Sequence, residues 1–290
     1  MAHRQAHKRG SHSRNPVARA PGSPSSSSSK PATVATPKRP VFTGPLYSWK
    51  LFFPGTELVY ATTTSAADDA ISRLVSPGQD VVVGLDLEWK PTRRAGEPEN
   101  CTALIQLSSE KMIVLLQISS MEDFPRSLWD FLQSSSSAKV GVGIQYDCTK
   151  LFKDFGASVR NCVDLSLLAR SADPQWKGNF NKPLGLAHLT EVYLEHLLPK
   201  GKVQRSNWEA RLSEEQQEYA ANDAQSALAI YNELITKAAA MVPVPERDCY
   251  SFDVIDGKLR DFEGRPWFPF NPHYDPGEIP TVKVAAPVDV

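Results

Sequence analysis

The chain has 290 residues, of which 41% are hydrophobic, so it is long enough for one large domain or two small ones and can bury a core. Its formal net charge is −1, but residues 1–44 carry eight basic residues and no acid, whereas the remainder carries 24 basic and 33 acidic residues. An acidic body argues against a surface that binds phosphate backbones throughout, and favours a local site where carboxylates bind divalent cations.

The cysteines and the hydropathy pattern exclude several further classes. The four cysteines form no C-x-x-C pair and no regular spacing, which argues against a zinc knuckle and against a disulfide framework. No run of about 18 apolar residues suggests a membrane span, and the N-terminus lacks the apolar core of a secretory signal. We therefore expect a soluble intracellular protein without a membrane partner.

Residues 1–45 are rich in Ser, Pro, Ala, Arg and Lys and show no apolar periodicity. This composition predicts a disordered basic tail. The Lys8-Arg9 and Lys38-Arg39 pairs resemble a weak nuclear address, which gives the nucleus as the expected location. The alternatives are a mitochondrial transit peptide and a solvated tail without an address.

Ordered structure is expected to begin near Leu46, in a dense apolar cluster. The strongest strand signal is at residues 81–89, which are apolar on both faces until the carboxylates begin, as in a central strand. Two further strands joined by a polar turn predict an antiparallel meander beside it. The elements expected in this half are a helix over 66–75, strands over 81–89, 102–108 and 112–117, and a helix over 127–133.

The second half begins with a glycine-rich strand and ends with a long helix. Ser213 and Gln216 form a capping box at the start of that helix. From Val242 onwards Pro and aromatic residues alternate with Asp and Gly, and no regular element is expected. The predicted elements are a strand over 140–144, a helix over 148–155, a strand or helix start over 163–168, and helices over 184–194 and 213–239. One folded domain is thus expected over 46–240, followed by a Pro- and aromatic-rich extension over 241–290.

Two acids interrupt the predicted central strand. Asp86 and Glu88 are two residues apart, so their side chains leave the same face, while Leu85 and Leu87 point to the opposite one. Two acids on an apolar strand repel each other and are costly to desolvate, and a divalent cation with oxygen ligands offsets both effects. The alternative is that the strand ends at Leu85 and that both acids are solvated.

Asp147 directly follows the strand predicted over 140–144. A junction between a strand and a helix delivers side chains to the carboxyl edge of a sheet, where catalytic residues are common. The alternative is that Asp147 only caps the following helix.

The long helix carries Tyr219 and Asp223, whose separation of four places them one above the other on one face. Small residues flank this face at positions 220, 221 and 224, so the helix can approach a sheet closely. A buried Asp in mid-helix is disfavoured by propensity and by burial, which favours a ligand role over an outward-facing, solvated Asp.

Three motifs together resemble the DEDDy branch of the ribonuclease H-like 3′-5′ exonucleases: Gly-Leu-Asp-Leu-Glu-Trp at 84–89, Gly-Val-Gly-Ile-x-x-Asp-x-x-Lys-Leu at 141–151, and Tyr-Ala-Ala-x-Asp at 219–223. Within this branch the chain is most similar to the group of the Werner syndrome exonuclease domain and its stand-alone relatives, because 103–107 and 206–208 also match. The resemblance covers about residues 79–238. The histidine branch has a His where this chain has Glu218, so the tyrosine branch is indicated.

The resemblance implies a three-layer α/β/α fold with a mixed central sheet and a two-metal active site. It implies that Asp86 bridges two Mg²⁺ or Mn²⁺ ions, that Glu88 and Asp223 complete the first metal site, and that Asp147 serves the second. Tyr219 would hold the attacking water by hydrogen bonding, because a phenol with a pKa near 10 is a poor base at neutral pH. No helicase motif and no helical domain of the ribonuclease D type is evident, which predicts a stand-alone nuclease.

Five residues are candidates for contact with the nucleic acid: Lys150, Trp176, Lys177, Lys202 and Arg205. Trp176 and Lys177 lie in a long segment over 173–183, where an aromatic ring can stack on a base and a cation can meet a phosphate. The alternative for each is an ordinary surface charge or an anchoring aromatic. Trp208 and His188 are expected to pack in the interior.

The expected function is 3′-5′ exonuclease activity on DNA. An RNA-trimming exonuclease of the ribonuclease D type has the same motifs, because sugar discrimination by contacts to the 2′-hydroxyl is not visible in a sequence. A nucleic-acid-binding module without activity is the third possibility, and the five intact residues of the motifs argue against it. The sequence predicts no oligomeric state.

Overall fold

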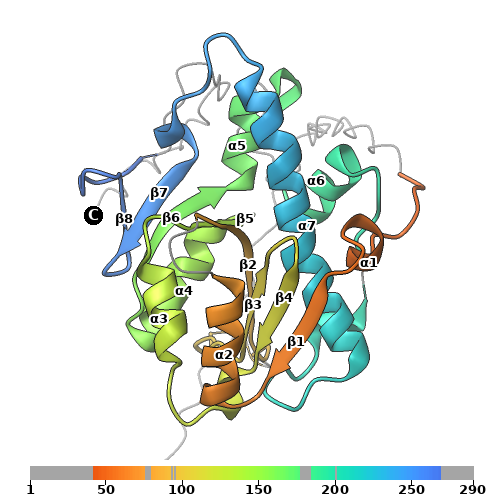
Figure 1. The fold of residues 1–290 in the computed structure, drawn as a ribbon, viewed down its shortest axis with the longest axis vertical. Coiled ribbons are helices and arrows are strands. Elements are labelled where there is room, and N and C mark those ends of the chain that lie inside the picture. Colours follow the sequence, from red (N-terminus) through yellow and green to blue (C-terminus); the bar gives the residue numbers. More distant parts are fainter. Residues whose placement is uncertain are drawn as a thin grey trace, which may run out of the picture. The chain divides into compact units, whose positions relative to one another are not determined.

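A computed structural model of the chain describes residues 42–75, 80–92, 94, 96–176, 184–199 and 201–268 (Figure 1). The predicted disordered tail over 1–45 falls almost entirely outside these residues, as does Lys177. Within the described residues, no helix is both long and apolar enough to cross a bilayer.

The fold is built on one eight-stranded mixed sheet with the strand order β1-β4-β3-β2-β5-β6-β7-β8. β2 lies in the interior of the sheet, antiparallel to β3 and parallel to β5, as expected for the central strand. The strands are β1 (Glu57–Ala61), β2 (Val82–Glu88), β3 (Leu104–Ser108), β4 (Met112–Leu116), β5 (Ala138–Gly141), β6 (Val159–Asp164), β7 (Ser251–Ile255) and β8 (Lys258–Arg260).

Helices cover both faces of this sheet, which confirms the three-layer α/β/α architecture. The helices α5, α6 and α7 pack together on one face, and α2, α3 and α4 lie on the other (Figure 1). The α-helices are α1 (Trp49–Phe52), α2 (Thr64–Leu74), α3 (Arg126–Gln133), α4 (Ile144–Phe155), α5 (Leu165–Ala172), α6 (Leu186–Tyr193) and α7 (Glu214–Ala239).

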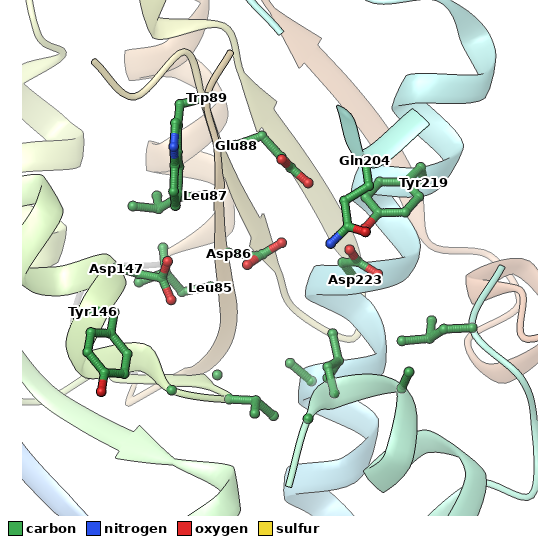
Figure 2. A pocket seen from close by; sticks show the side chains of 18 of the residues that line it. Leu85, Asp86, Leu87, Glu88, Trp89, Tyr146, Asp147, Gln204, Tyr219 and Asp223 are labelled. Carbon is green, nitrogen blue, oxygen red and sulfur yellow. The ribbon is translucent and has the colours of Figure 1, made fainter. Parts of the chain in front are cut away.

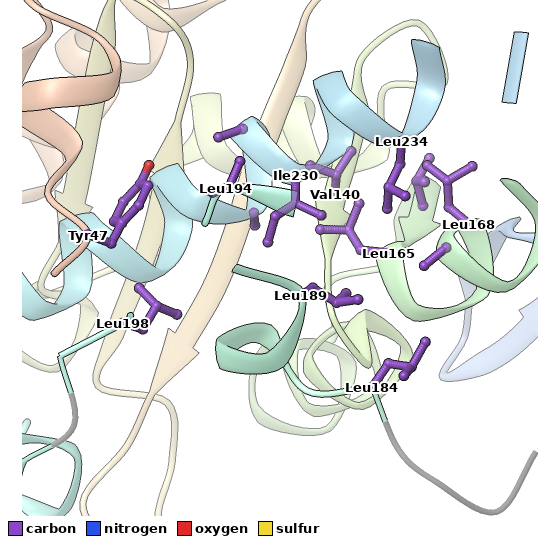
Figure 3. Packing of buried hydrophobic residues seen from close by; sticks show 14 of the residues in the cluster. Tyr47, Val140, Leu165, Leu168, Leu184, Leu189, Leu194, Leu198, Ile230 and Leu234 are labelled. Atoms are coloured by element: carbon purple, nitrogen blue, oxygen red, sulfur yellow. The ribbon is translucent and has the colours of Figure 1, made fainter. Parts of the chain in front are cut away.

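Each layer boundary has its own hydrophobic core. Leu85 and Leu87 of β2 point into the core under α2, α3 and α4, as their alternation with Asp86 and Glu88 predicted. The other core lies under α5, α6 and α7, where Val140 packs with Leu165 and Ile230 (Figure 3). The two acids of β2 therefore face the α7 side of the sheet.

Helix α7 crosses β2 at very short range. The helix begins after Ser213, which forms the predicted capping box with Gln216. A Cβ atom on Gly84 would lie only 2.0 Å from the backbone oxygen of Ala224, so only glycine permits this approach. Ala220, Ala221 and Ala224 are fully buried. The small residues thus bring Asp223 within reach of the strand.

Several element boundaries differ from the sequence predictions. β1, which pairs with β4 at one edge of the sheet, was not predicted, and α4 begins at Ile144 instead of residue 148. The expectation of no regular element after Val242 is wrong, because β7 and β8 extend the sheet beyond β6. These strands are short and lie between Pro-rich segments, but β7 places Phe252 and Val254 fully in the core.

Candidate active site

Three carboxylates from β2 and α7 converge on one point. Asp86, Glu88 and Asp223 each offer an oxygen atom such that the three oxygens lie within 4.8 Å of one another. Figure 2 shows the three side chains turned toward a common space between the strand and the helix. Carboxylate oxygens at this spacing are typical ligands for a divalent cation.

Asp147 faces the same cavity from the other side of Asp86 (Figure 2). It lies in the first turn of α4, directly beyond the carboxyl end of β5, and it does not cap the helix. Gly143 occupies the cap position with a left-handed φ of 69°, a turn that glycine makes without strain. Asp147 is not one of the three converging carboxylates. Asp86 lies between Asp147 on one side and Glu88 and Asp223 on the other (Figure 2).

Burial and mutual repulsion hold protons on these carboxyl groups. Burial raises the pKa of Asp86 to about 7. Burial together with Asp86, Asp223 and Asp147 raises the pKa of Glu88 to about 10. The pKa values of Asp147 and Asp223 lie well above their ordinary range, because both are desolvated and both face Asp86. Four acids crowded in this way store a repulsion that a bound cation would relieve.

Tyr219 stands one helical turn before Asp223, and its hydroxyl is close enough to that carboxylate for each group to shift the pKa of the other. Its ring contacts Trp208 at a centroid distance of 6.0 Å, and Trp208 is fully buried, as the sequence predicted. Burial and the neighbouring carboxylates raise the pKa of Tyr219 above its usual value. The phenol therefore stays neutral at physiological pH and acts as a hydrogen-bonding group.

The carboxylates form one wall of a cavity of about 820 Å³. This volume is large enough for a small ligand such as a nucleotide. The other lining residues are mostly apolar or aromatic and come from the ends of β2 and β5, from the start of α6, and from Leu198, Pro199, Gly201, Gln204 and Arg205. Arg205 supplies the single Lys or Arg side chain among the described lining residues. One cavity thus combines acidic groups with surfaces that suit a sugar and a base.

Two of the five candidates for contact with nucleic acid, Lys150 and Trp176, have buried side chains. The ammonium group of Lys150 lies in the interior, 3.1 Å from Asp154 and 4.7 Å from the ring centroid of Trp89, which leaves it badly placed to meet a phosphate. Trp176 is buried, and its indole N–H donates to the Tyr193 hydroxyl at 2.7 Å, so its ring is not available for base stacking. Both side chains therefore make their contacts within the protein.

The other described candidates lie on one 3₁₀ turn over Lys202–Arg205. Both are exposed, and Arg205 lines the cavity, whereas Lys202 does not. Lys177 lies outside the described residues. His188 is partly exposed and packs edge-on against Trp176, which agrees with the expectation of a packed residue.

Two residues of the cavity were not singled out from the sequence. Tyr146 is 76% exposed and lines the mouth of the cavity next to Asp147. Gln204 lines the same cavity as Tyr219 and Asp223 (Figure 2). Tyr146 directly precedes a predicted catalytic residue, which was a usable signal, whereas only the folded chain brings Gln204 to the site.

Comparison with known proteins agrees with the geometry of this site. The sequence profile of the 3′-5′ exonuclease family matches residues 58–238, which is more than half of the chain. A 3′-5′ exonuclease of Arabidopsis thaliana is 32% identical over 62% of this chain and 64% of its own length. The mouse bifunctional 3′-5′ exonuclease/ATP-dependent helicase WRN is 37% identical over 63% of this chain, but over only 13% of its own length. The matched regions thus span less than two thirds of these relatives.

Solved structures share the fold. Escherichia coli RNase D is 25% identical with a TM-score of 0.52, covering 64% of this chain and 45% of its own. Trypanosoma brucei RNase D, solved in complex with the RNA U12, has a TM-score of 0.55 at 20% identity, over 64% of this chain and 65% of its own. Together with the family match, these likenesses show that the chain belongs to the DEDDy 3′-5′ exonuclease family, as its three motifs predicted.

Proposed function

We propose that the protein is a metal-dependent 3′-5′ exonuclease that removes nucleotides from the 3′ end of DNA. The observation that carries this proposal is the convergence of Asp86, Glu88 and Asp223 within 4.8 Å, with Asp147 across from them in the same cavity. Mg²⁺ and Mn²⁺ prefer such oxygen ligands. Among the described residues that line the cavity, no Lys or Arg side chain lies at the centre of the acidic cluster.

The donor set fits two cations. Asp86 lies between the two subsites and would contact both ions, Glu88 and Asp223 would hold the first, and Asp147 would hold the second. When bound, two such ions lower the pKa of a water, neutralise charge on the phosphate and stabilise the departing oxygen. The raised pKa of the apo carboxyl groups means that metal binding must displace protons, so metal affinity should increase with pH.

The protein side chains supply orientation. With its single proton directed toward Asp223, the neutral Tyr219 hydroxyl can accept a hydrogen bond from the attacking water and so orient it. In hydrolysis the water oxygen bonds to phosphorus while the bond from phosphorus to the preceding 3′ oxygen breaks. The products are a nucleoside 5′-monophosphate and a strand shortened by one residue with a free 3′-hydroxyl. The exposed ring of Tyr146 is placed to contact the terminal base or sugar.

The test is digestion of oligonucleotides labelled at the 5′ end, with single-stranded, recessed and blunt 3′ ends, in Mg²⁺ or Mn²⁺. The proposal predicts a ladder of products that shorten one nucleotide at a time from the 3′ end and that disappear with EDTA. Internal cuts, release from the 5′ end, or no release with either metal would contradict it.

RNA is the second candidate substrate, because the fold is shared with Trypanosoma brucei RNase D, which was solved with RNA. The choice of DNA follows the resemblance of the sequence motifs to the group of the Werner syndrome exonuclease domain. The same assay with RNA and DNA of identical sequence distinguishes the two candidate substrates, because it compares their kcat/KM values on one enzyme preparation. A preference for RNA of more than about tenfold would replace the DNA assignment and keep the nuclease assignment.

A further inference from the structure

Gln106 is a buried polar residue in a strand whose residues are all buried. β3 runs from Leu104 to Ser108, and the side chain of Gln106 is fully shielded from solvent between β2 and α7. Burying an amide is costly unless it is hydrogen-bonded, and an apolar residue of similar shape would serve stability equally well. Stability alone therefore does not explain an amide at this position.

The register of the sheet places Gln106 directly opposite Asp86. β2 and β3 are antiparallel, and the two residues are paired across them, so both side chains leave the same face toward α7. In the orientation that satisfies both ends of the amide, its nitrogen donates to Asp86 Oδ2 at 3.1 Å and to the backbone oxygen of Ala220 at 3.0 Å. One side chain thus binds a strand carboxylate and the helix at once.

Both contacts bear on the geometry of the acids. The bond to Asp86 Oδ2 fixes the rotation of the carboxylate that lies between Asp147 and the other two acids. The bond to Ala220 reaches the helical turn that begins with Tyr219 and precedes Asp223. Gln106 therefore sets the distance and angle between the strand ligands and the helix ligands.

We infer that Gln106 is a positioning residue, which orients Asp86 for metal binding and couples β2 to the catalytic turn of α7. This inference rests on the proposed metal-dependent function. Partners behind metal ligands typically contribute 10- to 100-fold in metal affinity or activity. Loss of both donors should therefore weaken Mn²⁺ binding by roughly tenfold or more, although Gln106 would touch neither the metal nor the substrate.

The chain provides a matched control in Gln225. It is also fully buried, it also lies at the interface of α7 with the sheet, and its amide nitrogen reaches the backbone oxygen of Ser109 at 3.4 Å. Its contact lies at the opposite end of β3 from the carboxylates. Removal of this amide tests the cost of a buried glutamine without touching Asp86.

The experiment is calorimetric titration of Mn²⁺ into the wild type and into Gln106→Met, Gln106→Leu and Gln225→Met. Met keeps the length of the side chain and removes its polar atoms. Leu is a second apolar replacement in case the first variant does not fold. Thermal unfolding in EDTA reports the structural cost of each change, and single-turnover cleavage over a series of Mn²⁺ concentrations separates metal affinity from the rate at saturation.

We expect both Gln106 variants to raise the Mn²⁺ dissociation constant at least about tenfold, and Gln225→Met to leave it within twofold at a similar cost in melting temperature. Unchanged Mn²⁺ affinity in a folded Gln106 variant, with wild-type binding intact, would overturn the positioning role and leave the nuclease proposal standing. Absence of Mn²⁺ binding in the wild type would instead overturn the proposed function, and this inference with it.

Discussion

Two groups of buried charged residues meet on α4, where Asp147 of one group and Lys150 of the other lie three residues apart, and the two groups are built in opposite ways. Around Lys150, charges and donors are balanced: its ammonium group donates to the Asn100 carbonyl at 2.8 Å and pairs with Asp154 at 3.1 Å. Asp154 in turn accepts from the backbone and the hydroxyl of Thr102, both at 2.8 Å. This group has its partners within the protein.

The group around Asp86 lacks such a balance. Four carboxylates face one another, and burial and neighbouring acids raise their pKa values. Lys150 lowers the pKa of Asp147 but does not offset its burial, and Lys150 is not among the described residues that line the cavity. Such an arrangement costs folding free energy, since buried charges are normally paired. The comparison teaches that a balanced buried charge indicates architecture, whereas an unbalanced one indicates a ligand that the protein must acquire.

Replacing one acid in each group by its amide should have two different effects. The group around Asp86 should lose cleavage, and the group around Lys150 should lose stability. Asp223→Asn removes a proposed metal ligand and should lower single-turnover cleavage by roughly 1000-fold or more without loss of folding. Asp154→Asn should destabilise the fold and leave cleavage per folded molecule within tenfold. Gel-based cleavage and circular dichroism on both variants check this, and Asp223→Asn with activity within tenfold of the wild type would remove it from the metal site.

Replacement of the Tyr219 hydroxyl should have the next largest effect. Tyr219→Phe keeps the ring contact with Trp208 and loses only the group that orients the water. Turnover should fall by roughly 10- to 1000-fold, or about 1.4–4 kcal/mol in barrier, with little change in Mn²⁺ affinity. Single-turnover rates and a Mn²⁺ titration on the same sample separate the two. A weakened metal site with an unchanged saturated rate would show that Tyr219 is a ligand.

Removal of the central cation from the balanced group should act on stability. Lys150→Met leaves Asp154 buried without its partner and should cost about 3–5 kcal/mol in the free energy of unfolding. The matched control is Lys50→Met, because Lys50 pairs with Glu218 at 2.8 Å on an exposed surface, where such pairs contribute about 0–1 kcal/mol. Urea unfolding compares the two. Equal losses would mean that the Lys150 group is no more structural than a surface pair.

The pH dependence of stability should carry the signature of Asp86. Its folded-state pKa of about 7 lies above that of an unfolded Asp, near 3.9, so the folded state holds the proton more tightly. The contribution of Asp86 to the stability of the metal-free protein is therefore largest below about pH 4 and is lost as the pH rises from about 4 to 7.

Asp86→Asn removes the part of this loss that Asp86 contributes. In EDTA the variant should be roughly 1–3 kcal/mol more stable than the wild type at pH 8 and no more stable at pH 4. Chemical unfolding at both pH values provides the measurement. A wild type that is the more stable of the two at pH 8 in EDTA would show that the carboxylate is compensated within the protein.

The features predicted correctly from the sequence are those that depend on residue type and short-range spacing. The alternation around Asp86, the capping box at Ser213 and the offset between Tyr219 and Asp223 depend on spacing alone, and the structure has each of them. The small residues of α7 likewise predicted its close approach to β2. The importance of Gly84 became evident only in the structure, which shows that it faces the backbone of Ala224.

The missed features depend on contacts distant in sequence. Lys150 looked like a phosphate ligand because its pairing with Asp154 on the next turn and with the carbonyl of Asn100 needs the folded chain. β7 escaped prediction because five residues between turns carry a weak signal, and its pairing with β6 supplies most of its order. Gln204 lies in the 3₁₀ turn over Lys202–Arg205, and only the folded chain brings this turn to the cavity that the carboxylates line.

The central claim is that the unbalanced carboxylates acquire two cations. Anomalous diffraction from crystals grown with Mn²⁺ and a short oligonucleotide carrying a nonhydrolysable 3′ linkage tests it most directly. The account predicts two Mn²⁺ peaks about 4 Å apart, one among Asp86, Glu88 and Asp223 and the other between Asp86 and Asp147. A structure with the 3′ end bound in the cavity and no Mn²⁺ on Asp86 would contradict it.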